Sequence, residues 1–216
     1  MNSFTRPNYQ DTDRQPLIKL VPATVQRILD VGCNAGGFGL GVKALRATEI
    51  WGIEPDQNAA SIAAQRLDHV ITDFFSADND VPNGYFDLVT FNDSLEHMSN
   101  PTEALELAKW KLRSGGRVHC CVPNMRHIES LEHLILEKDW HYADQGVRDR
   151  THLRFFTQRS IVRLLEESGF RVIQTVGIND DWWAKEKVLR RILFRLFPES
   201  TKDMRHTQIV AIAEPT

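Results

Sequence analysis

The chain has few cysteines, little net charge and no long apolar run. Of its 216 residues only three are cysteine, and two of these, Cys120 and Cys121, are adjacent. Three cysteines cannot form a disulfide framework, which favours a reducing, cytoplasmic setting. The net charge of -3 leaves no basic footprint for a nucleic acid, so we expect no nucleic-acid partner. No stretch is apolar and long enough to span a membrane, and the N-terminus lacks the apolar core of a signal peptide.

What the chain does contain is an informative stretch between Arg27 and Glu54. An apolar run at 28–29 ends in Asp30 and is followed by a glycine-rich turn, a helical pattern, and a second apolar run at 50–53. The order is therefore strand, tight turn, helix, strand and acid. Such a turn brings backbone N–H groups close to a ligand, and Glu54 is placed to accept hydrogen bonds from ribose hydroxyls. The stretch predicts a site for a nucleoside-containing cofactor.

Two classes of cofactor compete for this turn. Gly32, Asn34 and Gly37 nearly match the dinucleotide pattern G-x-G-x-x-G. The second glycine of that pattern lets the backbone approach the pyrophosphate, and here Asn34 carries a side chain into that space. Asparagine tolerates left-handed backbone geometry, so the turn itself is retained. Asp30 stands just ahead of the first glycine, where it can meet a cationic group of the ligand. These features modestly favour a cofactor with a cationic group over a nicotinamide dinucleotide.

Short apolar runs alternate with helical patterns along the rest of the chain. This alternation predicts an α/β fold with a doubly wound, parallel sheet. The expected strands lie at 28–31, 50–53, 69–71, 86–91, 117–122, 171–176 and 208–213. We expect a single domain over 1–216, with an N-terminal leader at 1–26, an insertion at 124–157 that shows no strand rhythm, and a helical insertion at 178–206.

Four short motifs resemble those of the class I S-adenosylmethionine (SAM)-dependent methyltransferases. They are Asp30-x-Gly32-Cys33-x-x-Gly36, Phe86-Asp87-Leu88-Val89 followed by Ser94-Leu95-Glu96-His97, Leu112-x-x-Gly115-Gly116, and Glu166-x-x-Gly169-Phe170. The departures from the family are Asn34 for a glycine and Ser114 for a proline. The resemblance covers almost the whole chain. It implies a Rossmann-like, mostly parallel, seven-stranded sheet whose last strand, at 208–213, runs antiparallel.

The resemblance also implies S-adenosyl-L-methionine as the cofactor, with S-adenosyl-L-homocysteine as its product. The glycine turn would line the methionine moiety, Glu54 would bind the ribose, and Asp73 with Phe74 would hold the adenine. The leader would fold over the cofactor, where Arg14 could pair with its carboxylate. The full set of implied cofactor-binding residues is Tyr9, Arg14, Asp30, Gly32, Cys33, Asn34, Gly36, Glu54, Asp73, Phe74 and Asn92.

Two histidines are the candidates for catalysis. Transfer of a methyl group from a sulfonium is an in-line displacement with an activated leaving group, so catalysis is mostly positioning. A neutral hydroxyl acceptor still benefits from a base that titrates near neutral pH. The resemblance places His97 beside the methyl group, which makes it the first candidate, and His152 is its rival. The alternative for His97 is a structural role in the loop after the fourth strand.

Residues 139–157 would form part of a lid over the acceptor. The string from Asp149 to Thr157 resembles a D-x-x-H-x-R-F-F-T segment in methyltransferases from bacterial surface-polysaccharide and glycosyltransferase gene neighbourhoods. This resemblance implies a sugar or glycan acceptor. Histidine and arginine can bind hydroxyls or phosphates, and aromatic rings can stack on a sugar face. The candidate acceptor contacts are Tyr142, His152, Arg154 and Phe155.

The segment at 182–197 is amphipathic and basic. Its apolar stripe, which lies away from the lysine and arginine positions, consists of Val188, Leu189, Ile192, Leu193 and Leu196. Packing on the domain is the favoured interpretation, and peripheral contact with a membrane surface or a dimer interface are the alternatives. The sequence leaves the oligomeric state, monomer or dimer, open.

Together these patterns predict an enzyme that O-methylates a sugar, a glycan or a related small-molecule intermediate. The alternatives are an N- or C-methyltransferase for another small metabolite, a catalytically silent SAM-binding module and, more distantly, a nicotinamide oxidoreductase. We expect no metal, because the one conceivable ligand set, His141, Asp144 and His152, matches no standard spacing.

Overall fold

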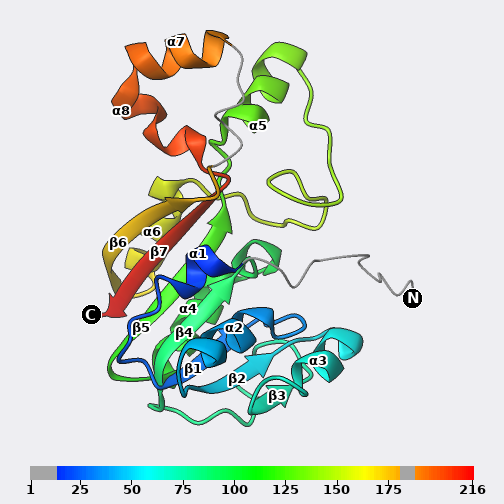
Figure 1. The fold of residues 1–216 in the computed structure, drawn as a ribbon, viewed down its shortest axis with the longest axis vertical. Coiled ribbons are helices and arrows are strands. Elements are labelled where there is room, and N and C mark those ends of the chain that lie inside the picture. Colours follow the sequence, from blue (N-terminus) through cyan, green and yellow to red (C-terminus); the bar gives the residue numbers. More distant parts are fainter. Residues whose placement is uncertain (1–13, 181–187) are drawn as a thin grey trace.

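The computed structural model describes residues 14–180 and 188–216, whose core is one seven-stranded sheet. The strands follow the spatial order β3-β2-β1-β4-β5-β7-β6. Neighbouring strands from β3 to β5 are parallel, whereas β7 is antiparallel to both β5 and β6 (Figure 1). The strands are β1 (Arg27–Val31), β2 (Glu49–Ile53), β3 (His69–Ile71), β4 (Phe86–Asn92), β5 (Leu112–Pro123), β6 (Phe170–Ile178) and β7 (Gln208–Pro215). The predicted fold class is confirmed, including the antiparallel last strand.

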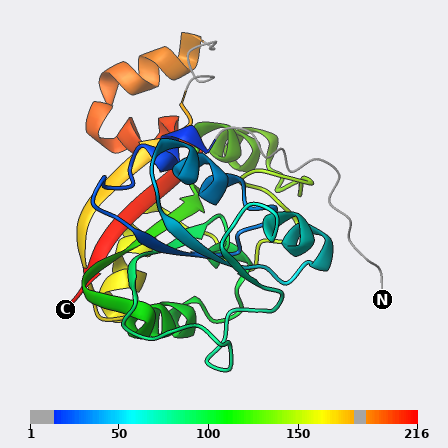
Figure 2. The ribbon, with the colours of Figure 1, turned by 60° about the horizontal axis from the view of Figure 1, so that its bottom comes forward.

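Helices cover both faces of the sheet, because successive strand side chains alternate between two apolar clusters. Ile28 and Leu88 belong to one cluster, and their neighbours Leu29 and Val89 belong to the other. Figure 2 shows the two helical layers on opposite sides of the twisted sheet. The helices are α1 (Gln15–Ile18), α2 (Gly37–Leu45) and α3 (Gln57–Ala63) on the first face, and α4 (Pro101–Lys111) and α6 (Gln158–Glu167) on the second.

Two helix starts follow from local sequence signals. Asp56 is the N-cap of α3, and its Oδ1 accepts a hydrogen bond from the backbone N of Ala59 at 2.8 Å. Thr157 caps α6 in a capping box with Ser160, whose backbone N donates to Thr157 Oγ1 at 3.2 Å. Both caps satisfy backbone donors that the first helical turn leaves unpaired.

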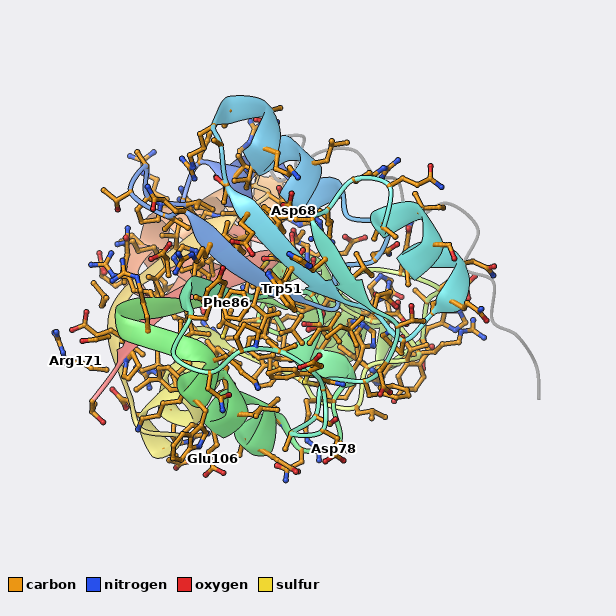
Figure 3. The ribbon with its side chains drawn as sticks, turned by 90° about the horizontal axis from the view of Figure 1, so that it is seen from below. Trp51, Asp68, Asp78, Phe86, Glu106 and Arg171 are labelled. Carbon is orange, nitrogen blue, oxygen red and sulfur yellow. The ribbon has the colours of Figure 1, made fainter. Side chains whose placement is uncertain are left out.

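Aromatic contacts join β2 to other strands of the sheet. Trp51 stacks on His69 with ring centroids 4.1 Å apart, and it meets Phe86 edge-on at 6.0 Å. Figure 3, seen from below, shows Trp51 and Phe86 near each other, with Arg171 at the far edge of the molecule. Aromatic pairs of this geometry add stabilisation beyond the area they bury. They therefore strengthen the sheet on the face that carries α4 and α6.

A group of short helices lies beyond the carboxyl end of β5 (Figure 1). It comprises α5 (Ile128–Glu132), η2 (His133–Glu137), α7 (Val188–Leu196), α8 (Pro198–Thr201) and η3 (Lys202–Arg205). Phe194 is buried against Ile128 and Met204. Arg190 pairs with both carboxylate oxygens of Glu132, at 2.7 and 2.6 Å. An apolar cluster and a two-pronged ion pair thus hold α7 on α5.

Two sequence expectations about element boundaries and faces are wrong in part. The strand expected at 117–122 begins at Leu112. Phe86 pairs with Leu112 and Leu88 with Arg117, so the residues between 112 and 117 form an irregularity within the strand and not a turn before it. The apolar stripe expected on 182–197 does not match the buried side of α7: Phe194 is buried, whereas Ile192 and Leu196 are exposed. Packing on α5 decides this orientation. Residues 181–187 of that segment lie outside the described residues. Within the part of the chain that the structure describes, no helix is long and apolar enough to cross a membrane.

Candidate active site

The carboxyl ends of β1, β2 and β4 meet where the strand order reverses, which is where open α/β sheets bind ligands. A cavity of about 630 Å³ opens there. The predicted cofactor-binding residues that line it are Arg14, Gly32, Asn34, Glu54, Asp73, Phe74 and Asn92. Three others, Asp30, Cys33 and Gly36, do not line the cavity, and Tyr9 lies outside the described residues. The structure therefore brings most of the predicted set together around one space, which we call the cofactor cavity.

The glycine turn has the backbone geometry that its residue types predict. Gly32, Asn34 and Gly36 have φ angles of 78°, 49° and 78°, in the region that favours glycine and tolerates asparagine. A Cβ atom on Gly32 would lie 2.7 Å from Cβ of Ser94, so this position also excludes a side chain for lack of space. Cys33 turns the other way and is buried in the apolar cluster beneath α2. Its backbone, not its thiol, belongs to the turn.

Glu54, at the end of β2, holds the turn in place. Its Oε2 accepts a hydrogen bond from the backbone N of Asn34 at 2.8 Å, and its Oε1 accepts one from the backbone N of Asp56 at 2.9 Å. A carboxylate offers about four acceptor positions. Glu54 can therefore bind ribose hydroxyls and keep its backbone contacts at the same time.

Asp73 and Phe74 form another part of the cavity lining. The Asp73 Oδ1 accepts a hydrogen bond from the backbone N of Phe74 at 2.7 Å, which fixes the turn after β3. Phe74 is 74% exposed, so its ring is available to pack against a bound base. Phe75, which sequence reasoning missed, also lines the cavity and packs edge-on against Phe91.

Asp30 lies next to the cavity lining as a buried carboxylate. It is 1% exposed, and its Oδ1 accepts hydrogen bonds from Thr90 Oγ1 at 2.7 Å and from Asn92 Nδ2 at 3.1 Å. Burial raises its pKa from 3.8 to about 6, although the Thr90 hydrogen bond and the charge of Arg14 act in the opposite direction. A cationic group bound nearby would stabilise the ionised form.

Replacing Asp30 by asparagine should stabilise the ligand-free protein above about pH 6. The folded-state pKa lies above the unfolded value, so the contribution of this group to stability is fully present below about pH 4 and is lost as the pH rises through about 6. The loss is on the order of 3 kcal/mol. Urea unfolding of both proteins across this range measures it. The advantage of the variant should shrink toward pH 4, and a variant less stable than the wild type near neutral pH would contradict this account.

Arg14 contacts a carboxylate that sequence reasoning missed. Its Nη1 lies 2.5 Å from Oδ2 of Asp93, so its partner in the structure is a protein side chain. Asp93 directly follows β4, is largely buried and has a φ of 58°, an uncommon backbone conformation for a residue other than glycine. Such conformations cluster at functional sites. The sequence signal that could have identified Asp93 is its position, an acid shortly after a predicted parallel strand.

A second cavity, of about 450 Å³, shares part of its lining with the cofactor cavity. Asp93 and His97 line both spaces. Both cavities therefore adjoin these two side chains. We call the second space the acceptor cavity.

The His97 ring is held by Thr151, which lies within the insertion at 124–157. Its Nδ1 lies 3.1 Å from the carbonyl oxygen of Thr151 and 3.2 Å from Oγ1 of the same residue. The Thr151 hydroxyl in turn donates to Oδ1 of Asp149 at 2.7 Å. Because a carbonyl oxygen only accepts, Nδ1 carries the proton in this arrangement. The proton-accepting nitrogen of neutral His97 is then Nε2.

His152, the rival base, is buried beside Glu96 and also lines the acceptor cavity. Its Nε2 lies 3.9 Å from Oε1 of Glu96, and its ring centroid lies 4.9 Å from that of His97. Burial lowers the pKa of His152 and raises the pKa of Glu96 well above its usual range. The structure thus brings the two predicted catalytic histidines together, although they come from distant parts of the chain.

The other predicted acceptor contacts do not line either cavity. The backbone N–H groups of Leu153 and Arg154 both donate to the carbonyl oxygen of Glu96, and the Arg154 guanidinium donates to the carbonyl oxygen of Ser99. Phe155 and Tyr142 are exposed at 42% and 48%. The cation that lines the acceptor cavity is Arg148, which sequence reasoning missed.

The glycine turn, the acid at the end of β2 and the cavity at the strand-order reversal define a Rossmann-like, SAM-dependent methyltransferase. Comparison with known proteins agrees with this class. The profile of a family described as "Methyltransferase domain" matches residues 8–175, and the chain belongs to this family.

Curated relatives include ubiquinone biosynthesis O-methyltransferases from several bacteria. The protein of Aromatoleum aromaticum is 24% identical over 165 residues, which cover 71% of this chain and 68% of that protein. The protein of Aeromonas salmonicida is 26% identical over 163 residues, which cover 71% and 66%. The chain thus spans about two thirds of the length of these relatives.

Solved structures share the fold at lower identity. A SAM-dependent methyltransferase from Archaeoglobus fulgidus has a TM-score of 0.64 and 18% identity, covering 88% of this chain and 86% of that chain. The [4+2]-cyclase SpnF has a TM-score of 0.60 and 20% identity, covering 93% and 79%. These likenesses concern the fold alone, and the second shows that the same fold serves another reaction.

Proposed function

We propose that this methyltransferase O-methylates a hydroxyl group of a small, polyhydroxylated acceptor such as a sugar, with His97 as the general base. The observation that carries the proposal is the position of His97, which lines both the cofactor cavity and the acceptor cavity. Donor and acceptor would meet beside it. The curated relatives are O-methyltransferases, which supports oxygen as the methylated atom.

The proposed reaction needs few groups from the protein. The acceptor oxygen attacks the methyl carbon of the sulfonium, the carbon–sulfur bond breaks, and its electron pair stays on the sulfur of S-adenosylhomocysteine. The hydroxyl proton passes to Nε2 of His97 and from there to water. The protein has to align the two molecules and accept the proton. The hydrogen bond from His97 Nδ1 to the Thr151 carbonyl supports that role because it holds the ring in one orientation, and the Thr151 hydroxyl in turn donates to Asp149.

The lining of the acceptor cavity supports a hydrophilic acceptor. The polar side chains along it are Asp93, Glu96, His97, His127, Glu129, Ser130, Gln145, Arg148, Asp149, His152, Thr207 and Gln208. Its remaining lining residues are Pro123, Ala143, Gly146 and Val147, and no phenylalanine, tyrosine or tryptophan is among the described lining residues. Hydroxyls of a sugar would find many partners there. An intermediate of ubiquinone biosynthesis, which the names of the relatives suggest, is the second candidate acceptor.

An amine acceptor is the alternative that a specific observation favours. Asp93, Glu96 and Asp149 place three largely buried carboxyl groups around the acceptor cavity. Such a surplus of acids attracts a cationic group. N-methylation of an amine would follow if the acceptor carries one.

A methylation screen with labelled SAM tests the proposal. We expect product from nucleotide-linked or free sugars, with the label on a sugar oxygen, and none from protein or nucleic acid. Arg148→Ala should raise KM more for an anionic sugar than for its neutral analogue, because Arg148 lines the cavity. Arg154→Ala is the comparison variant. If Arg154→Ala raises KM for the anionic sugar more than Arg148→Ala does, the acceptor contacts Arg154, as the sequence predicted, and not Arg148. Product from phenols or amines alone would rule out the sugar.

A further inference from the structure

The acceptor cavity contains a buried carboxyl group to which no described residue donates a hydrogen bond. Glu96 is 1% exposed and lines this cavity. Neither of its side-chain oxygens has a hydrogen-bond partner among residues 14–180 and 188–216. A carboxylate buried without donors is unfavourable, and proteins compensate such a group with a proton or with a cation. Glu96 has no role in the proposed methyl transfer.

Two imidazole rings surround this carboxyl group. One ligand atom from each of Glu96, His97 and His152 can be chosen so that all three lie within 4.8 Å of one another. The His152 Nε2 is 3.9 Å from Oε1 of Glu96. A cation bound at about 2.0–2.2 Å from each ligand would bring these atoms to roughly 3.3 Å apart. Small side-chain rotations would close the site.

We propose that Glu96, His97 and His152 bind one divalent transition-metal cation at the acceptor cavity. Two imidazoles and a carboxylate suit zinc and other first-row divalent ions, and three protein ligands leave a coordination position open toward the cavity. The hydrogen bond from His97 Nδ1 to Thr151 orients Nε2 as a ligand. The functional consequence rests on the proposed function: an acceptor hydroxyl bound to the cation has a lowered pKa and gives its proton to water. With the cation bound, His97 Nε2 is a ligand, and the role of base described above belongs to the metal-free enzyme.

Metal titration of the full chain, without donor or acceptor, tests the site. After treatment with EDTA and its removal, calorimetry with zinc chloride and absorption spectroscopy with cobalt chloride measure binding. We expect one ion per chain. Glu96→Gln and His152→Ala should each weaken binding by at least about tenfold, because each removes a ligand. His141→Ala is the matched control, because His141 is exposed and lies outside the cluster, and its zinc affinity should equal that of the wild type.

Two results would overturn the site. One is the failure of the folded wild-type chain to bind zinc or cobalt, and the other is binding that Glu96→Gln and His152→Ala both leave unchanged. Circular dichroism tests whether each variant is folded. If Glu96→Gln or His152→Ala does not fold, His97→Ala takes its place in the titration. Because binding is measured without methyl transfer, its failure leaves the proposed function standing. Absence of sugar methylation, conversely, leaves a measured cation site intact.

Discussion

Replacing His97 by alanine should slow methyl transfer by about a hundredfold or more, because the acceptor hydroxyl loses the group that takes its proton. His97 lines both cavities, and Thr151 holds its ring. The contacts of Glu54 with the glycine turn do not involve it. The dissociation constant for SAM should therefore change by less than about threefold. Single-turnover assays and calorimetry measure the two quantities separately.

Two further histidine variants make this result interpretable. His133→Ala is the control, because His133 lies on η2, pairs with Glu137 and lines neither cavity; its turnover should match the wild type. His152→Ala tests the rival base. If His97→Ala keeps the wild-type rate while His152→Ala abolishes it, the proton passes to His152 and the assignment of the base is wrong.

Replacing Glu54 by alanine should raise the dissociation constant for SAM by about 10- to 150-fold. The variant loses charge-assisted hydrogen bonds to the ribose, which are worth about 1.5–3 kcal/mol together. It also releases the backbone N–H groups of Asn34 and Asp56, so the glycine turn loses support. Calorimetry with SAM and with S-adenosylhomocysteine should show the same loss, because both carry the ribose.

Glu49 provides the matched control for Glu54. It lies at the opposite end of β2, where its carboxylate accepts from the Tyr85 hydroxyl at 2.9 Å and from Trp51 Nε1 at 2.8 Å. It does not line the cofactor cavity. Glu49→Ala should leave the affinity for SAM unchanged. Equal affinity in Glu54→Ala and the wild type would remove Glu54 from the ribose site.

The strands and the glycine turn were within reach of the sequence because their causes are local. A strand buried on both faces is a mostly apolar run, as at 86–91, where Asp87 and Thr90 are the polar exceptions. Such a run can be found in the sequence without knowledge of the tertiary contacts. The positive φ angles of Gly32 and Asn34 follow from residue type. The caps at Asp56 and Thr157 depend only on the next three residues.

Beyond His97 and His152, the lining of the acceptor cavity was beyond reach because its residues come from segments that only tertiary contacts bring together. Leu153 and Arg154 bond to the carbonyl oxygen of Glu96, and this pairing turns Arg154 outward while Arg148 lines the cavity. No local pattern encodes the direction of a loop side chain. The same holds for α7, where Phe194 is buried because α5 lies against it.

By itself the sequence determined a doubly wound sheet, a nucleoside-binding turn and the acid that follows it, since periodicity, glycine geometry and strand ends are properties of neighbouring residues. Only the tertiary structure decided that Asp93 and His97 line both cavities, and that Glu96 is buried beside His152 with no hydrogen-bond donor among the described residues. The physical reason for this difference is the distance along the chain over which each property is set. Backbone conformation is set mainly within a few residues, whereas desolvation and charge in a cavity depend on every segment that closes it.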